Sequence, residues 1–469
     1  MRTRSSALSL AVLAAFALSA CAGFSADGGF AGVESAAKDR LGKDVKWAKT
    51  DADRDALEKR VTELLAKPLS VDDAVQIALL NNKGLQASFA ELGITEAELV
   101  QAGRLPNPGF SFGRLTRGNE VEIERGIHFN LARLLAMPLI SEVEGRRFAR
   151  VQSEATQQML SLASQTRKAW IAAVAAGETV GYMQQVRQAA EAGAELGRRM
   201  AQAGNWNKIT QAREQSFYAD AALNLARAER AQLAARERLT RLMGLWAMQT
   251  VFTLPARLPD LPAAAQELPG VEQAALAQRL DVQAARLGAE QTAKNLGLTR
   301  TTRFINVLEL GVVHNNSNEK PIQRGYELRF ELPLFDWSGA RVARAEAIYM
   351  QAVSRAAEAA VNARSEVREA YLGYRSSHDM ARHYRDEIVP LKKRISEENV
   401  LRYNGMLIGV FELLADARSQ IAGVNGYIEA LRDFWLAQAD LDMALIGKPS
   451  LSAIPAAGMT PPAASAAAH

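Results

Sequence analysis

The chain has few of the residues with which enzymes do chemistry. Among its 469 residues are one cysteine and five histidines. His378 and His383 lie five positions apart, on different faces of any helix, so they do not have the spacing of metal ligands. No GxSxG or HExxH motif occurs, and GKPS at 447–450 lacks the upstream glycine spacing of a phosphate-binding loop and the Ser or Thr directly after the lysine. The other histidines are His128, His314 and His469. We therefore expect no enzyme, no metal site and no cofactor.

Other absences exclude further classes of protein. A single cysteine excludes a disulfide within the chain. After the first 20 residues no stretch of about 20 apolar residues occurs, so no helix is expected to span a membrane. The 56 Lys and Arg residues are interleaved with 52 Asp and Glu residues, and the formal net charge is only +4. No basic cluster marks a nucleic-acid surface, and no nucleic-acid partner is expected.

The N-terminus has the composition of an export signal. MRTR is basic, ALSLAVLAAFAL is apolar, and LSAC at 18–21 ends in the only cysteine. This segment resembles a bacterial lipoprotein signal, which implies that residues 1–20 are removed and that Cys21 carries the lipid. Ala22 follows the cysteine where an aspartate would imply retention at the inner membrane, so the resemblance favours the outer membrane. The alternative is an ordinary secretory signal with an incidental cysteine.

The sequence repeats itself at a spacing of about 200 residues. The matching segments are 81–113 with 277–311, 134–150 with 329–344, and 203–244 with 403–447. Each half is expected to run helix, strand, loop, strand, long helix and returning helix. Gly204 and Gly405 mark the turns between the last two helices, and Gly244 and Gly447 mark their ends.

The repeat divides the chain into two similar parts with flanking segments. The first repeat covers 68–250, with a helical hairpin at about 142–246, and the second covers 271–449, with a hairpin at about 340–447. Between them, 251–270 is rich in proline and is interpreted as a linker. We expect 21–67 to be an extended, lipidated N-terminal arm. The tail at 450–469 has few residues that could pack and is expected to be disordered.

Each half contains two candidate strands. They are expected at about 108–115, 121–131, 305–314 and 325–334. In YELRFELPLF, Tyr326 to Phe335, large apolar residues alternate with charged residues, which is typical of a strand with one apolar face. Arg125 interrupts the same pattern in the second strand. A soluble sheet packed on helices would also alternate. However, the helix from Glu142 to Gln202 contains no proline and would be roughly 90 Å long, too long to fold back as a cover.

An apolar face that lacks a helical cover indicates a sheet in a membrane. Such a sheet must close into a barrel, and the smallest bacterial barrels have about eight strands. Four strands cannot close alone, whereas three copies of the chain would supply twelve. The residues expected to face lipid are Phe110, Phe112, Ile127, Phe129, Leu308, Leu310, Phe330 and Leu332.

With these features in place, residues 69–447 resemble the TolC-type outer-membrane channels of tripartite efflux systems. The most specific stretches are PLSVDDAVQIALLNNKGLQA, RLPNPGFSF, ELPLFDWSGARVARAEA and YNGMLIGVFELLADAR. The resemblance implies a mainly α fold with a membrane β part: a homotrimer whose 12-stranded β-barrel continues into a 12-helix periplasmic barrel closed at its inner end. It also implies a passive export conduit that contacts outer-membrane lipid, a periplasmic adaptor protein and an inner-membrane pump.

The resemblance also implies roles for the helical turns. Glu412 and Asp416, one turn apart, would form the periplasmic gate, where three copies would place six carboxylates around one axis. The alternative for this pair is a solvated helix face. The expected adaptor-contact tips hold Asn205, Trp206, Met406, Leu407 and Ile408. The apolar residues of the second tip could instead pack on the neighbouring hairpin.

The sequence leaves the cargo and a rival architecture open. Carboxylates at Glu309, Glu327 and Glu331 would favour cations if they line the lumen, and YNGMLIGVFELLADAR is similar to channels associated with heavy-metal or copper resistance. The candidate cargo is therefore metal cations or small toxic compounds. The rival hypothesis is a periplasmic coiled-coil lipoprotein scaffold with a small soluble sheet and no pore.

Overall fold

The computed structural model describes residues 23–302, 307–331 and 335–450. The predicted signal segment, Cys21, Leu332 and the tail from 451 onward lie outside the described residues. The chain divides into two compact units, each built from segments of both sequence halves. Unit 1 comprises residues up to 42, 84–158 and 280–362, and unit 2 comprises 43–83, 159–279 and from 363 onward. The units therefore do not correspond to the two repeats.

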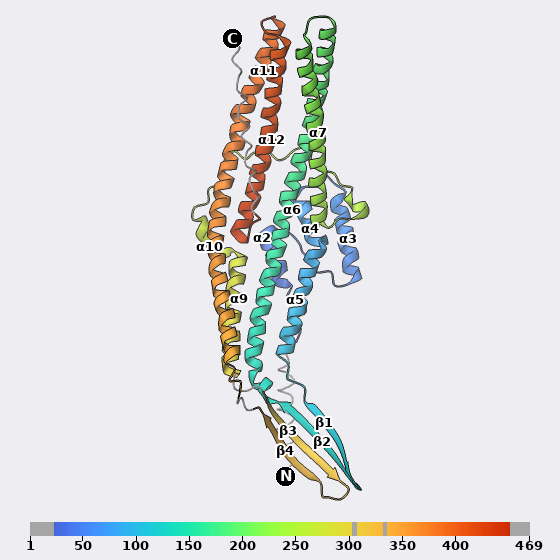
Figure 1. The fold of residues 1–469 in the computed structure, drawn as a ribbon, viewed down its shortest axis with the longest axis vertical. Coiled ribbons are helices and arrows are strands. Elements are labelled where there is room, and N and C mark those ends of the chain that lie inside the picture. The colour runs from blue at the N-terminus through green and yellow to red at the C-terminus, as the bar shows by residue number, and fades with distance from the viewer. Residues whose placement is uncertain (1–22, 303–306, 332–334, 451–469) are drawn as a thin grey trace. The chain divides into compact units, whose positions relative to one another are not determined.

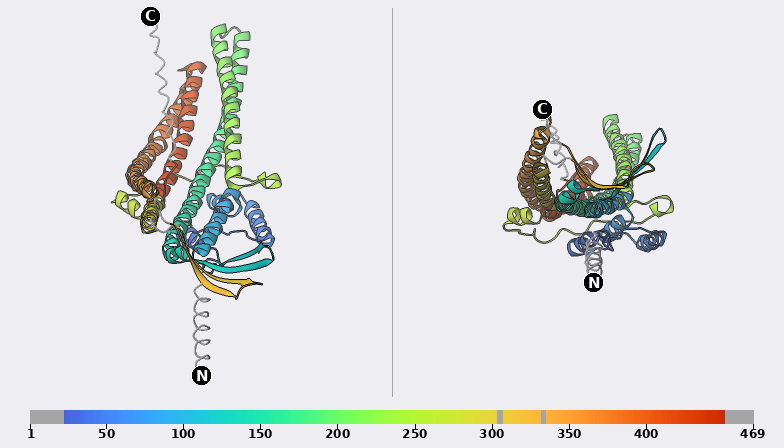
Figure 2. Two further views of the ribbon diagram at one scale, coloured as in Figure 1. Left: turned by 60° about the horizontal axis from the view of Figure 1, so that its bottom comes forward. Right: turned by 90° about the horizontal axis from the view of Figure 1, so that it is seen from below.

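Unit 1 contains one four-stranded antiparallel sheet in the order β1-β2-β3-β4 (Figures 1 and 2). The strands are β1 (Gly109–Arg117), β2 (Glu120–Asn130), β3 (Leu308–Ser317) and β4 (Gln323–Phe330). The hairpin between β1 and β2 turns at Gly118 and Asn119, and Gly118 has the positive φ of 60° that such short turns favour. The pairing of β2 with β3 joins the two halves of the sequence in one sheet.

Helices enter and leave this sheet at the end away from the hairpin turns (Figure 1). Unit 1 holds α2 (Ala31–Leu41), most of α5 (Lys83–Ala102), α9 (Leu280–Thr302), and the beginnings of α6 (Leu131–Gln202) and α10 (Gly339–His383). The N-terminal segment packs on these helices. The ring of Phe30 meets that of Phe89 edge to face with centroids 4.8 Å apart. The amide of Ser25 donates to Glu96 Oε1 at 2.7 Å.

Unit 2 is a bundle of helices packed around a large apolar core. Its further helices are α3 (Asp51–Leu65), α4 (Val71–Asn81), α7 (Lys208–Met243), η1 (Ala247–Thr250), α8 (Val271–Gln278), η2 (Tyr384–Ile388), α11 (Val389–Asn404) and α12 (Val410–Ile446). Trp170, Met243, Tyr374 and Phe434 are buried in that core. The indole N–H of Trp170 donates to the carbonyl of Leu69 at 2.8 Å, so its one polar group is satisfied.

The proline-rich segment 251–270 runs without helix across unit 2. It is held by its own apolar residues, because Leu258 and Leu261 are buried in the helical core. The indole N–H of Trp435 donates to the carbonyl of Pro259 at 3.0 Å. The linker therefore packs on the helices of unit 2 along its length.

The helix ends follow from local sequence. Thr50 and Asp53 form a reciprocal capping box at the start of α3, and Asn207 caps α7 through the amide of Thr210. Gly244 ends α7 with a φ of 67°, as its position in the sequence predicts, and an added Cβ would lie 2.9 Å from the carbonyl oxygen of Asn81. Gly447 ends α12.

Two features differ from the sequence predictions. The arm at 21–67 is not extended, since it contains α2 and α3, and the polar composition of α3 hid a helix that its capping box starts. The second long helix is also not continuous. It widens into a π turn at η2, which ends two residues before Pro390, whose missing N–H and bulky ring break the α-helical hydrogen-bond pattern.

Candidate functional site: a two-faced sheet and two helical tips

The strand register separates the sheet into an apolar face and a polar face. In antiparallel pairs, directly opposed residues project to the same side. Phe110 opposes Ile127, which opposes Val312, and Val312 opposes Tyr326. Phe129 opposes Leu310, and Leu308 opposes Phe330. The register therefore places every described residue predicted to face lipid on this apolar face: Phe110, Phe112, Ile127, Phe129, Leu308, Leu310 and Phe330.

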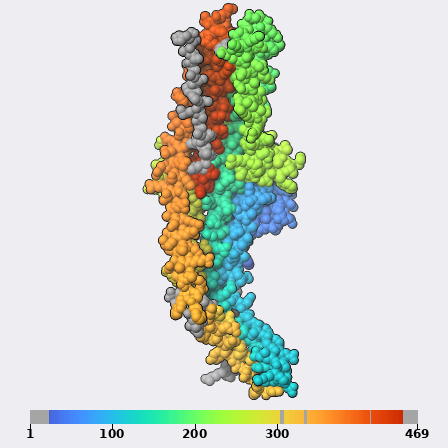
Figure 3. All heavy atoms as spheres, in the orientation of Figure 1, coloured from blue at the N-terminus to red at the C-terminus, as the bar shows by residue number. Residues whose placement is uncertain are grey.

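These side chains are not covered by the rest of unit 1. Phe110 is 70% exposed and Phe330 is 57% exposed, whereas Leu308 is half-buried. On the face visible in Figure 3, the atoms of the strands lie at the surface (cyan, yellow and orange). A sheet with large exposed aromatic residues is costly in water and typical of an interaction or membrane surface.

The polar face carries all the acidic residues of the four strands. These are Glu120, Glu122, Glu124, Glu309 and Glu327. Arg329 Nη1 and Nη2 lie 3.3 Å from carboxylate oxygens of Glu309 and Glu327, respectively. Two of the three carboxylates predicted to attract cations thus share an arginine, and Glu331 is exposed just beyond β4. The negative charge at this end of the face is smaller than the sequence alone suggested.

His128 lies on the polar face, where neighbouring residues are small. Its Nε2 lies 2.8 Å from Ser111 Oγ. The ring lies over two glycines, because a Cβ added at Gly311 would come within 2.6 Å of Nδ1 and one at Gly126 within 2.9 Å of Nε2. The small residues make room for the imidazole.

The turn between α6 and α7 forms the first tip of unit 2 (Figure 1). Asn205 is exposed there, but Trp206 is half-buried. The indole lies against Gly197 of α6, where an added Cβ would be 3.0 Å from the ring. Trp206 therefore packs the turn against α6 of the same hairpin, and part of its ring stays exposed to solvent.

The turn between α11 and α12 forms the second tip (Figure 1). Met406 is 93% exposed and Leu407 is 77% exposed, while Ile408 is half-buried. Met406 also has a φ of 59°, a left-handed conformation that costs a non-glycine residue roughly 1–2 kcal/mol. Exposed apolar side chains on a strained turn are typical of a contact surface.

The candidate gate residues lie in the first turns of α12. Glu412 is exposed, and Asp416 is half-buried. The amide group of Asn399 in α11 donates to Asp416 Oδ2, so this carboxylate also ties α12 to α11. The two carboxylates are thus not equivalent within one chain.

An ion pair that the sequence did not predict lies close to these gate residues. Arg418 of α12 donates from Nη2 to Glu214 Oε1 of α7 at 2.7 Å, and its guanidinium carbon lies 4.3 Å from the ring centroid of Phe217. The Glu214 side chain is 1% exposed. The pair connects the hairpin of the first half to that of the second. Arg418 ends a stretch already noted for its resemblance, but nothing in the sequence around Glu214 signals that this glutamate is buried.

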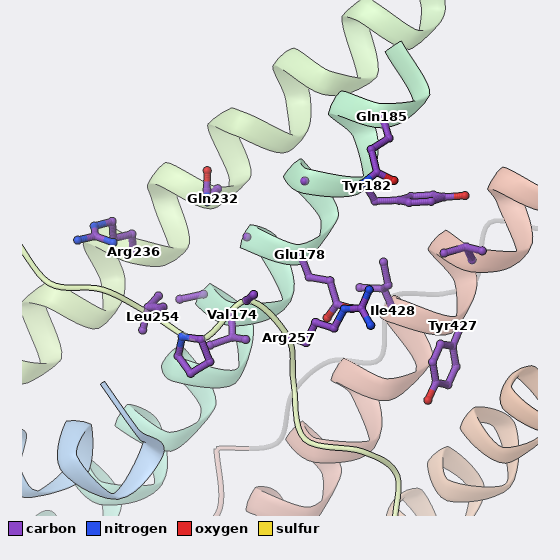
Figure 4. Close-up of a pocket in the computed structure, with 16 residues that line it drawn as sticks. Val174, Glu178, Tyr182, Gln185, Gln232, Arg236, Leu254, Arg257, Tyr427 and Ile428 are labelled. Atoms are coloured by element: carbon purple, nitrogen blue, oxygen red, sulfur yellow. The ribbon is translucent and has the colours of Figure 1, made fainter. Parts of the chain in front are cut away.

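Unit 2 also contains a cavity of about 640 Å³ between α6, α7, α12 and the linker (Figure 4). Glu178 projects toward it beside Arg257, with 3.9 Å between Oε1 and Nε. Its other oxygen, Oε2, is buried and has no hydrogen-bond partner in the described part of the chain. Burial raises the pKa of Glu178 above the ordinary value. Tyr182 and Tyr427 line the same cavity.

Within the described ranges, no group of three or more His, Cys, Asp or Glu side chains is arranged to hold a metal ion. Among the described helices, none combines the length and the apolar composition of a membrane span.

Comparison with solved structures identifies the fold. No protein-family model matches the chain, and no curated protein matches its sequence. The CmeC outer-membrane channel of Campylobacter jejuni is similar, with a TM-score of 0.67, 17% identity, and coverage of 80% of this chain and 85% of that one. The chain has the fold of outer-membrane channels.

Two further solved channels support the same conclusion. The open state of the Neisseria gonorrhoeae MtrE outer-membrane channel has a TM-score of 0.66 and 19% identity, over 80% of this chain and 89% of that chain. CusC, described for its transmembrane channel formation, has a TM-score of 0.66 and 17% identity, over 80% and 92%. The resemblance seen in the sequence is thus confirmed in fold, including its mainly helical class with a small antiparallel sheet.

Proposed function

We propose that this chain is the outer-membrane channel of a tripartite efflux system and works as a homotrimer. The observation that carries the proposal is the exposed apolar face of the sheet, with every described strand glutamate on the opposite face. In a barrel wall, apolar residues face lipid and polar residues face the lumen. The likeness to CmeC and MtrE, which are outer-membrane channels, supports the same function.

Three copies are the simplest way to close the barrel. Among the described residues, β1 and β4 each pair on one side only, so each has an open edge. An unpaired backbone edge is not tolerated in hydrocarbon. Pairing β1 of one copy with β4 of the next would satisfy both edges and give a 12-stranded barrel.

The order of elements supports an internal duplication and a second, helical barrel. Two strands followed by a long helix and a returning helix occur as β1, β2, α6 and α7, and again as β3, β4, α10 to α11 and α12. Three copies would supply 12 helical rods for a periplasmic tunnel. Lipidation at Cys21 would hold the N-terminus at the outer membrane.

The two tips are the proposed contact with a periplasmic adaptor protein, through which an inner-membrane pump supplies the energy. Met406 and Leu407 are the strongest candidates because they are exposed on a strained turn. Glu412 and Asp416 are the proposed gate residues. A ring of these carboxylates from three copies would favour cations, and metal cations or small toxic compounds are the proposed cargo.

Replacing apolar-face residues tests the channel. The variant Leu310→Asp with Phe330→Asp places charges on the proposed lipid side, and Val313→Asp with Gln323→Asp is the control on the polar face of the same two strands. We expect the first variant to lose most of its trimer from the outer membrane and the control to retain it. A normal yield of membrane trimer from the first variant would favour the scaffold without a pore.

A further inference from the structure

Charge is segregated between the two faces of the sheet. The five strand glutamates lie on the polar face, whereas the apolar face carries only arginine as a formally charged side chain within the described strands. Its arginines are Arg114, Arg125 and Arg324. All three are exposed, and none has an ion-pair partner among the residues that the structure describes.

These arginines lie close together on two neighbouring rungs of the sheet. Arg125 of β2 opposes His314 of β3, which opposes Arg324 of β4. Arg114 of β1 opposes Ile123 and is therefore a diagonal neighbour of Arg125, within roughly 7–8 Å. We call Arg114, Arg125, His314 and Arg324 the basic row. A row of like charges without counter-charges repels itself.

The basic row lies toward the hairpin turns, whereas Phe110, Phe129 and Phe330 lie toward the helices. Phe112 of β1 opposes Arg125 and lies within the row. Six positions separate Phe330 from Arg324 along β4, which is roughly 20 Å of strand. With the tilt usual in barrels this becomes about 15 Å of height, within an apolar band of about 25 Å. With Phe330 taken as the helix-side edge of the band, the row lies in its turn-side half, where arginine stems can extend and place guanidinium groups among lipid headgroups.

We propose that the basic row binds the phosphate groups of an anionic glycolipid in the outer leaflet. This inference rests on the proposed function, because it requires the apolar face to contact lipid and the turns to face the exterior. Planar guanidinium groups pair with phosphate through two hydrogen bonds each, and phosphate supplies the negative charge that the apolar face lacks. The lipid would in turn relieve the repulsion within the row.

The test uses the full chain purified in detergent and diphosphorylated lipid A as the probe. The variant replaces Arg114, Arg125 and Arg324 with glutamine, which removes all three arginine charges from the apolar face. Arg117→Gln is the matched control, since Arg117 lies at the same end of β1 on the polar face. We expect each arginine to contribute up to about ten-fold in affinity for lipid A. The triple variant should therefore bind lipid A at least about ten-fold more weakly, and the control should bind as wild type does.

Two further measurements distinguish lipid phosphate from free phosphate and test the arginines one at a time. Inorganic phosphate at millimolar concentration should not displace lipid A, and removing one phosphate from lipid A should weaken binding. Displacement by inorganic phosphate would overturn the lipid assignment. The single variants Arg125→Gln and Arg324→Gln should each give an intermediate loss, which preserves the test if the triple variant assembles poorly.

Failure of this inference is distinguishable from failure of the channel. If the wild type is a detergent-dependent trimer but the triple variant binds lipid A equally well, the basic row does not bind lipid and the channel still stands. If an acidic protein co-purifies with wild type and not with the variant while lipid binding is unchanged, the row binds protein instead. A detergent-independent monomer would overturn both proposals.

Discussion

Arg418 of α12 and Glu214 of α7 form an ion pair, at 2.7 Å, that connects the two helical hairpins of unit 2. Glu214 is fully buried, and its second oxygen and the Nε of Arg418 have no hydrogen-bond partner in the described chain. Phe217 lies under the guanidinium group. The hydrogen-bonding groups of the pair are therefore only partly satisfied. The pair holds α12 beside α7 more than it adds to the net stability of the fold.

Removing one member of this pair should be more costly than removing both. We expect Arg418→Met to destabilise the protein by about 3 kcal/mol, because it leaves the Glu214 carboxylate buried alone, and Glu214→Gln with Arg418→Met to recover much of that loss. Arg187→Met, which removes an exposed ion pair within α6, is the control and should cost less than about 1 kcal/mol. Denaturant unfolding in detergent measures these differences. Equal losses of stability in Arg418→Met and Arg187→Met would show that burial of Glu214 is not decisive.

Two glycines of α12 should respond oppositely to alanine. A Cβ at Gly426 would lie 2.7 Å from the ring of Tyr384 in the π turn, whereas one at Gly423 would meet only the flexible side chains of Lys392 and Ile388, the nearest at 3.4 Å. We expect Gly426→Ala to destabilise by about 1–3 kcal/mol through overpacking. Gly423→Ala should stabilise by about 0.5–1 kcal/mol through backbone entropy. Thermal unfolding of the two variants side by side gives the signs, and a stabilising Gly426→Ala would contradict the close packing of α12 on the π turn.

Glu178 should give unit 2 a measurable pH dependence. Burial raises its folded-state pKa, so the associated stability is fully present below the ordinary glutamate pKa of about 4.3 and is lost as pH rises through the higher folded-state value. We expect Glu178→Gln to be more stable than wild type at pH 8 and to lose that advantage near pH 4. Thermal midpoints across this range measure the difference. Glu229→Gln, on the exposed side of α7, is the control. A constant difference between Glu178→Gln and wild type would contradict the assignment.

The sheet was predictable from sequence because its signal is local. Alternation of apolar and charged residues from Tyr326 to Phe330 requires only that the strand have two different faces, and the structure places these residues as expected. Arg125, which interrupts the pattern, belongs to the basic row on the apolar face. The apparent exception was thus part of a second pattern that only the register reveals.

Other features depend on contacts that no local pattern encodes. Glu214 and Arg418 are 204 positions apart, and their partnership exists only because α7 and α12 pack together. Trp206 was predicted at an exposed tip, but Gly197 gives its indole a place to pack. The helix α3 was missed for another reason: its capping box was present in the sequence, but its polar composition suggested an arm.

The protein mass of the particle extracted from the outer membrane tests the central claim most directly. Light scattering corrected for bound detergent measures it without assuming a shape. We predict three chains per particle, because only shared strands close the open edges of β1 and β4. A monomer that stays dispersed without detergent would contradict the channel, since four strands with open edges cannot span a membrane.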